Sequence, residues 1–374
     1  MISRILETMG HGRASKQDFQ SSDMTLGIIE GFFGHSWSWQ ARFDFADFLF
    51  EQGFDSYLYA PKADSCFRKQ WFSACPASQL AKLQDLAAHY RHHHIDFGMG
   101  LSPVELYRNF DHAQQQVLER KIQEINHIGA RTLCILFDDM RGDFPGLARQ
   151  QAAIVQFAAD HSQADRLLIC PTYYSSDPLL SRVFGDMPDH YLEDLGRLLD
   201  PAVEIFWTGP RVFSHDFPAL HMQEVTEKLR RKPLIWDNYP VNDSQRLSPF
   251  LHLRPFAEEK KSLLHDASGH FVNPMNQAWL SRIALYSLPR LHHQAHYDAE
   301  AVLRSACYTL CGRKLGQSLL DDLEVFQDQG LERLDAEARL ALKEKYRSFG
   351  DNPYVREIMA WLDNYYVFDP ACLT

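Results

Sequence analysis

The chain has 374 residues, of which 45% are hydrophobic, 23% charged and 13% aromatic. This amount of apolar material is enough for a large core and excludes a globally disordered chain. The formal net charge of −11 argues against a protein that binds nucleic acid or an anionic membrane surface.

Seven cysteines are scattered along the chain without a CxxC pair. Such a set is atypical of a disulfide scaffold and favours a reducing compartment, so we expect a cytoplasmic protein. No apolar run approaches the ~20 residues that a membrane-spanning helix needs. Residues 1–23 carry charged side chains and no apolar signal segment, so we expect a flexible leader, with Met24 as an alternative start.

The predicted elements begin with a short apolar run at 26–29, followed by a helix over 40–52 with Phe45, Phe48 and Leu49 on one face. The second predicted strand, 56–60, is stopped by Pro61. The next helix is expected to begin near Ser78, which has the side chain of a typical N-cap. Strand and helix therefore alternate from the start of the sequence.

The third predicted strand covers 96–100, and the helix after it is expected to end at Gly129. The fourth, 132–137, is apolar without alternation, which is typical of a parallel strand buried on both faces, and a helix is predicted over 148–160. Further strands are predicted at 167–170, 203–206, 234–236 and 270–272, with helices at 190–199, 222–230 and 277–288.

Eight strand–helix units of this length predict an α/β fold, a (β/α)8 TIM barrel, over residues 24–295. An open doubly wound sheet is the alternative, but the sequence has no glycine-rich phosphate-binding fingerprint. Residues 296–374 have helical spacing and are predicted to form a short C-terminal helical region. A cap on the barrel and a homodimer surface both fit this region.

Polar side chains follow the predicted strands, where a barrel enzyme places its active site. The sharpest feature is the adjacent pair Asp138 and Asp139 after the fourth strand. Repulsion and burial raise the pKa of at least one carboxyl in such a pair, which suits a general acid. The alternative is a structural pair that caps a helix or binds a cation. Adjacent acids also differ from the usual glycosidase pair, whose carboxylates face each other ~5–9 Å apart.

Seven motifs in order resemble glycoside hydrolase family 84, the O-GlcNAcase-like β-N-acetylglucosaminidases that include enzymes described as bacterial hyaluronidases. The resemblance covers about seven-tenths of the chain, and the sequence departs from it at Phe33, where family members often carry tyrosine. The motifs are GIIEGFFG at 27–34, YLYAPK at 57–62, LFDD at 136–139, CPTYY at 170–174, WTGP at 207–210, WDNYPVND at 236–243 and NP at 273–274.

The resemblance implies a retaining, substrate-assisted hydrolysis in which the 2-acetamido oxygen attacks C1 and forms an oxazoline. It implies that Asp138 holds and polarises the acetamido N–H. It also implies that Asp139 protonates the leaving oxygen as the general acid and then acts as the general base on water. It implies sugar contacts for Gly31 and Lys62 at O3, for Asp243 and Asn273 at O4 and O6, and for Tyr174, Trp236 and Asn238 around the acetamido group.

The predicted function is therefore an exo-β-N-acetylglucosaminidase acting on a GlcNAc-bearing glycan or glycoprotein. The resemblance implies no cofactor, and the histidine clusters lack the carboxylates and spacing of a known metal site. Two alternatives stay open. One is a hydrolase of another N-acetylhexosamine glycan, such as a hyaluronan, cell-wall or chitin fragment. The other is a non-catalytic GlcNAc-binding protein on the same barrel.

Overall fold

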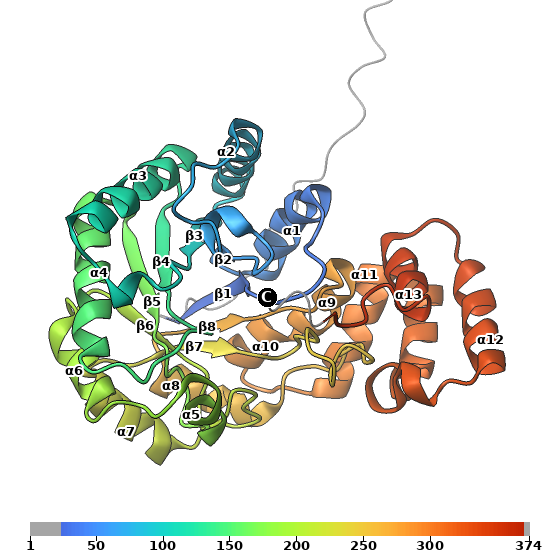
Figure 1. Cartoon of the computed structure of the whole chain (residues 1–374). Coiled ribbons are helices and arrows are strands. Elements are labelled where there is room, and N and C mark those ends of the chain that lie inside the picture. Colours follow the sequence, from blue (N-terminus) through green and yellow to red (C-terminus); the bar gives the residue numbers. More distant parts are fainter. Residues whose placement is uncertain (1–23, 370–374) are drawn as a thin grey trace, which may run out of the picture.

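The strands form a closed parallel barrel in a computed structural model that describes residues 24–369 (Figure 1). Strand β8 pairs with β1 and completes the ring, which confirms the predicted (β/α)8 barrel. The predicted leader, residues 1–23, lies outside the described residues. The strands are β1 Thr25–Glu30, β2 Ser56–Tyr59, β3 Asp96–Leu101, β4 Thr132–Leu136, β5 Arg166–Cys170, β6 Glu204–Trp207, β7 Leu234–Asp237 and β8 Gly269–Val272.

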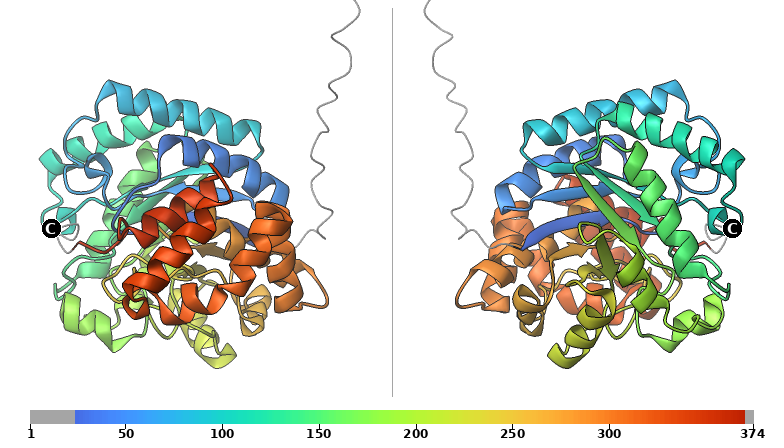
Figure 2. Two further views of the ribbon diagram at one scale, coloured as in Figure 1. Left: turned by 90° about the vertical axis from the view of Figure 1, so that its right-hand side faces the viewer. Right: turned by 90° about the vertical axis from the view of Figure 1, so that its left-hand side faces the viewer.

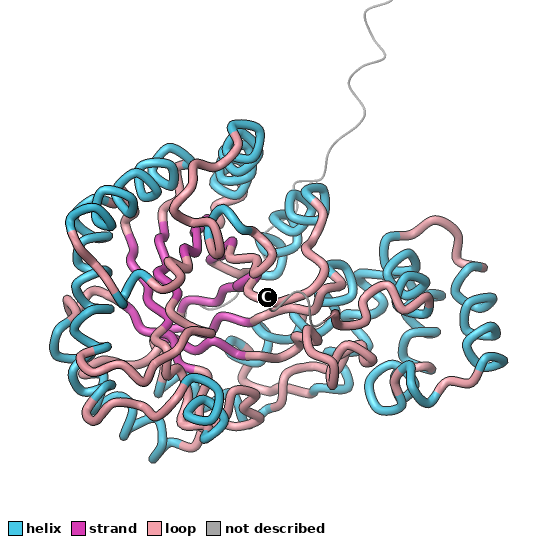
Figure 3. The backbone as a smooth tube through the Cα atoms, in the orientation of Figure 1, coloured by secondary structure: helices cyan, strands magenta, loops and turns pink. Residues whose placement is uncertain are grey.

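Helices surround the strands on the outside of the barrel, as Figure 3 shows. None of the helices within residues 24–369 is long and apolar enough to cross a bilayer. The helices of the barrel are α1 Trp39–Gln52, α2 Ala77–His92, α3 His112–Ile128, α4 Leu147–His161, α5 Pro178–Phe184, α6 Tyr191–Leu198, α7 Ala219–Leu229, α8 Leu263–Asp266, α9 Ala278–Leu285 and α10 Ser287–His293.

Three helix predictions differ from the structure. Helix α2 begins at Ala77 after Pro76, so Ser78 lies inside the helix and does not cap it. The single helix predicted over 277–288 is two helices, because Pro289 has no N–H to donate to the carbonyl of residue 285. Helix α5 was not predicted, although Asp177 caps it and a proline follows at its first position, a common start signal.

The inside of the barrel is filled by a compact apolar cluster from alternate strand positions, including Leu58, Leu136 and Phe206. Two members of this cluster, Cys170 and Trp236, lie at the carboxyl ends of their strands and also line a cavity above the barrel. The core therefore forms the floor of the candidate site.

The C-terminal helices lie against one side of the barrel (Figure 2). They are α11 Ala299–Asp321, α12 Ala336–Arg347 and α13 Pro353–Leu362, with a π-helical turn η4 at Val325–Gln329. Glu357 of α13 accepts hydrogen bonds from the backbone N–H groups of Trp279 (3.0 Å) and Leu280 (2.8 Å) in the first turn of α9. The residue before α9, Gln277, makes no such bond with its side chain, so the cap of this barrel helix comes from the C-terminal region.

Burial raises the pKa of Glu357 to about 7, against the two backbone N–H groups, which lower it. A carboxyl whose pKa is raised on folding stabilises the fold most below its unfolded pKa, and that stabilisation is lost as the pH rises through about 7. We therefore expect the unfolding free energy of the wild type, minus that of Glu357→Gln, to fall between pH 5 and pH 8. Urea denaturation at several pH values measures this difference. Glu344 is exposed, so Glu344→Gln is the control. The unfolding free energy of the wild type, minus that of Glu344→Gln, should not fall in the same way between pH 5 and pH 8.

Candidate active site

A cavity of about 140 Å³ opens at the carboxyl ends of the strands. The residues that line it come from the ends of β1, β2, β4, β5, β6, β7 and β8. The cavity brings together every candidate residue of the sequence analysis: Gly31, Lys62, Asp138, Asp139, Tyr174, Trp236, Asn238, Asp243 and Asn273.

The two acids after β4 both contact the Lys62 ammonium. Asp138 Oδ2 bonds to Lys62 Nζ, and Asp139 Oδ2 lies 3.2 Å from the same nitrogen. Neighbouring side chains in a strand point to opposite faces, but Asp139 has a φ of 61°, in the left-handed region. This turn allows both carboxylates to reach one cation. Strained backbone of this kind is typical of functional sites.

The two carboxyls differ in exposure. The side chain of Asp138 is 7% exposed, whereas that of Asp139 is 26% exposed and open to the cavity. Burial raises the pKa of Asp138, and the Lys62 ammonium opposes this effect. The second oxygen of Asp138, Oδ1, is buried and has no hydrogen-bond partner in the structure. A buried carboxylate oxygen without a partner keeps an unused capacity to accept a hydrogen bond.

The opposite wall is held by the amide of Asn238. Its Oδ1 accepts hydrogen bonds from Trp236 Nε1 (3.0 Å) and Asn273 Nδ2 (3.1 Å). Its Nδ2 donates to the carbonyl of Val212 (2.9 Å). These bonds fix the indole ring and both amides relative to one another, so this wall is preorganised.

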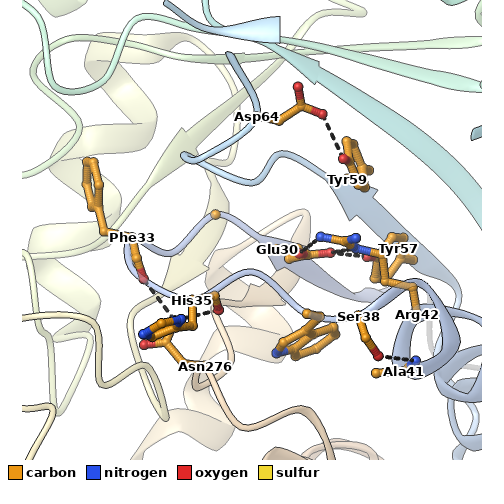
Figure 4. A network of polar contacts seen from close by, with 12 residues as sticks. Glu30, Phe33, His35, Ser38, Ala41, Arg42, Tyr57, Tyr59, Asp64 and Asn276 are labelled. Atoms are coloured by element: carbon orange, nitrogen blue, oxygen red, sulfur yellow. Dashed lines mark hydrogen bonds and ion pairs between the residues drawn. The ribbon is translucent and has the colours of Figure 1, made fainter. Parts of the chain in front are cut away.

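The loop after β1 closes a third side. The N–H of Phe33 donates to Asp243 Oδ2 (2.8 Å) and its carbonyl accepts from Asn276 Nδ2 (2.8 Å; Figure 4). Burial raises the pKa of Asp243 to about 6, although the Phe33 N–H lowers it. Below this loop, buried Glu30 accepts two hydrogen bonds from Arg42, at 2.8 and 2.6 Å (Figure 4). That ion pair anchors the end of β1.

Residues 26–328 match a family model described as beta-N-acetylglucosaminidase. The chain belongs to the β-N-acetylglucosaminidase family. This confirms the resemblance to glycoside hydrolase family 84 and places the protein among the glycoside hydrolases.

The chain is similar to mouse and rat proteins named protein O-GlcNAcase. Each is 28% identical to it over 271 residues. The match covers 70% of this chain and 29% of each relative, so the chain spans less than a third of their length. A solved O-GlcNAc hydrolase variant from Thermobaculum terrenum is similar in structure, with a TM-score of 0.74 at 28% identity. That similarity covers 91% of this chain and 80% of the other.

Part of the cavity of this family member could not be predicted from the sequence. Val212 and Phe213, in the loop after β6, line it, and 43% of the Phe213 surface is exposed. The motif before them, WTGP, ends at Pro210, and no periodic pattern in the sequence continues beyond it. Lys62 was predicted only as a contact to the sugar. In the structure, its ammonium contacts both acids.

Proposed function

We propose that this chain is a retaining exo-β-N-acetylglucosaminidase that removes terminal β-linked GlcNAc through an oxazoline intermediate. One observation carries the proposal: Asp138, whose buried Oδ1 has no hydrogen-bond partner, lines the cavity beside the more exposed Asp139. A substrate acetamido N–H supplies the donor that this oxygen lacks. The neighbouring carboxyl is then within reach of the glycosidic oxygen.

In the first step, the acetamido oxygen attacks C1 and the C1–O bond to the leaving group breaks. Asp139 gives its proton to the departing oxygen. Asp138 accepts a hydrogen bond from the acetamido N–H and stabilises the positive charge that develops on that nitrogen. The Lys62 ammonium offsets one of the two negative charges that the carboxylates carry after the proton has left.

In the second step, the Asp139 carboxylate takes a proton from water, and the water oxygen attacks C1. The C1–O bond of the oxazoline breaks, and its electron pair returns to the acetamido group. Each step inverts C1, so the product keeps the β configuration. The acid that protonated the leaving group thus serves as the base.

The arrangement of the acids supports a nucleophile that comes from the substrate. A two-carboxylate glycosidase holds its acids on either side of the scissile bond, ~5–9 Å apart. Here Asp138 and Asp139 are neighbours in the chain and contact one Lys62 ammonium. Two acids on one side leave the opposite face of the sugar to the acetamido oxygen.

The remaining cavity residues bind the sugar in this proposal. Tyr174, Trp236 and Asn238 surround the acetamido group, with the indole as a flat apolar wall. The other contacts are Asp243 and Asn273 at O4 and O6, and Gly31 and Lys62 at O3.

Gly31 packs directly under the indole of Trp236. A Cβ at this position would lie 2.6 Å from Trp236 Cζ2, too close for any real contact, so the ring must move. We expect Gly31→Ala to lower kcat/KM for an aryl β-GlcNAc at least about tenfold, because displacing a binding wall by ~1 Å is costly. Steady-state kinetics and the melting temperature Tm separate this effect from unfolding. An unchanged kcat/KM in a folded variant would show that the Trp236 wall does not act on the sugar.

We propose a GlcNAc-bearing glycoprotein or glycan as the substrate, because relatives are named O-GlcNAcase and O-GlcNAc hydrolase. We also propose a division into a barrel over 24–295 and a helical region over 296–374, a cytoplasmic location and a homodimer.

Release of 4-methylumbelliferone from its β-GlcNAc and β-glucose conjugates tests the activity. We expect turnover of the first only, because glucose has no acetamido group. Binding of GlcNAc without turnover would instead indicate a sugar-binding protein.

A further inference from the structure

The loop after β7 carries two cavity residues, Asn238 and Asp243, and folds back on itself. We call residues 238–243 its inner arm and residues 249–254 its outer arm. Hydrogen bonds join the arms side by side, from Tyr239 Oη to the Arg254 carbonyl (2.6 Å), from His252 Nδ1 to the Pro240 carbonyl (2.9 Å) and from Asn242 Nδ2 to the Phe250 carbonyl (2.9 Å). The position of the inner arm therefore depends on the outer arm.

The outer arm is bonded along its other edge to the C-terminal region, which lies beside this loop in Figure 1. The N–H of Leu251 donates to the carbonyl of Phe326 (2.9 Å), and the N–H of Leu331 donates to the carbonyl of Pro249 (3.0 Å). The inner arm, the outer arm and residues 326–331 thus form three adjacent layers. The first layer carries the sugar contacts, and the last belongs to the C-terminal region.

The side chain of Gln327 in η4 contacts both arms. Its Oε1 accepts hydrogen bonds from the N–H groups of Leu253 and Arg254, both at 2.8 Å. Its Nε2 donates to Tyr239 Oη (3.4 Å) on the inner arm. Leu253 is 1% exposed, so its N–H would lose its acceptor without Gln327 and would be costly to leave unpaired. Next to it, Asp328 and Arg254 form a two-bonded ion pair at 2.7 and 2.5 Å.

We propose that Gln327 is a positioning residue, through which the C-terminal helical region holds the sugar-binding arm of the same chain in place. This inference rests on the proposed function, because it uses Asn238 and Asp243 as sugar contacts. It gives the C-terminal region a role within one chain. Gln327 does not line the active-site cavity but lines an adjoining hollow that also contacts Asn238, so we expect its effect on sugar binding and not on the acids.

The test is Gln327→Ala, with Gln329→Ala as the matched control. Gln329 lies in the same turn, and its side chain bonds to Glu324 (3.2 Å), away from the loop. We expect Gln327→Ala to raise KM for the 4-methylumbelliferyl β-GlcNAc conjugate and the inhibition constant of GlcNAc about fivefold or more. The pH profile of kcat should stay as in the wild type, because the acids are untouched. Gln329→Ala should change none of these values.

Gln327→Glu keeps an acceptor for the N–H groups of Leu253 and Arg254 and loses the donor to Tyr239. We expect it to recover part of the affinity, and it serves as the test variant if Gln327→Ala does not fold. A lower Tm with unchanged KM and GlcNAc affinity in the folded variant, or an equal loss in Gln329→Ala, would overturn the proposal. Calorimetric titration with GlcNAc measures sugar affinity without turnover, so it tests the positioning role directly. If the wild type showed no turnover, that result would bear on the proposed function and not on the role of Gln327.

Discussion

Asp139→Asn is expected to lower kcat about 10²–10⁴-fold on substrates with a poor leaving group, the range that general acid catalysis contributes. The amide fills the same space, so sugar binding should persist, but its N–H is far too weak an acid to protonate the leaving oxygen. An activated leaving group such as 2,4-dinitrophenolate needs little protonation. We therefore expect a much smaller loss for that substrate in the glycosylation step.

Asp143→Asn is the matched control, because Asp143 lies in the same loop and is paired with Arg141. It should leave kcat within about twofold, as expected for an exposed ion pair. An equal loss of kcat/KM in Asp139→Asn for good and poor leaving groups would exclude Asp139 as the general acid, because kcat/KM reports the glycosylation step. Rates for a series of aryl β-GlcNAc substrates with different leaving-group pKa values provide the measurement.

Asp138→Asn should behave differently and lose activity regardless of the leaving group. Its carboxylate acts on the acetamido group, and the acetamido oxygen must attack C1 for every substrate. We expect kcat to fall about 10²–10³-fold, a loss typical of removing one preorganised group that stabilises the transition state. The amide also leaves the Lys62 ammonium with Asp139 as its remaining carboxylate partner.

The two variants are distinguished by plotting log(kcat/KM), which reports the glycosylation step, against leaving-group pKa. The slope should steepen in Asp139→Asn and stay close to that of the wild type in Asp138→Asn. Tm values and the affinity for GlcNAc show whether each variant is folded. If a better leaving group restored the activity of Asp138→Asn, the result would contradict the role of Asp138 at the acetamido group.

The barrel and the composition of its cavity could be predicted from the sequence for one physical reason. Parallel strands in a barrel end at the same rim, so side chains that follow apolar runs meet there regardless of their separation in the chain. Glu30, at the end of β1, and Asn273, after β8, are far apart in sequence and adjacent in the barrel. The alternation of strand and helix indicated where the strands end, the resemblance to glycoside hydrolase family 84 selected nine candidate residues there, and all nine line one cavity.

Details that depend on side-chain geometry could not be predicted in this way. The contact of Lys62 with both acids requires the left-handed backbone of Asp139, which the letters of the sequence do not specify. Gln327 and Glu357 act on the barrel through tertiary contacts, and nothing near them in the sequence indicates their partners. In contrast, the break before α10 was readable, because Pro289 cannot continue the hydrogen bonds of α9.

Substrate assistance is tested most directly with aryl β-glucosaminides whose N-acetyl group carries an increasing number of fluorines. Each fluorine withdraws electrons and makes the acetamido oxygen a weaker nucleophile. We predict that kcat/KM falls steeply with every added fluorine, with the leaving group held constant. A kcat/KM that does not depend on fluorination would contradict the account, because it would mean that an enzyme carboxylate or a water molecule attacks C1 in place of the substrate.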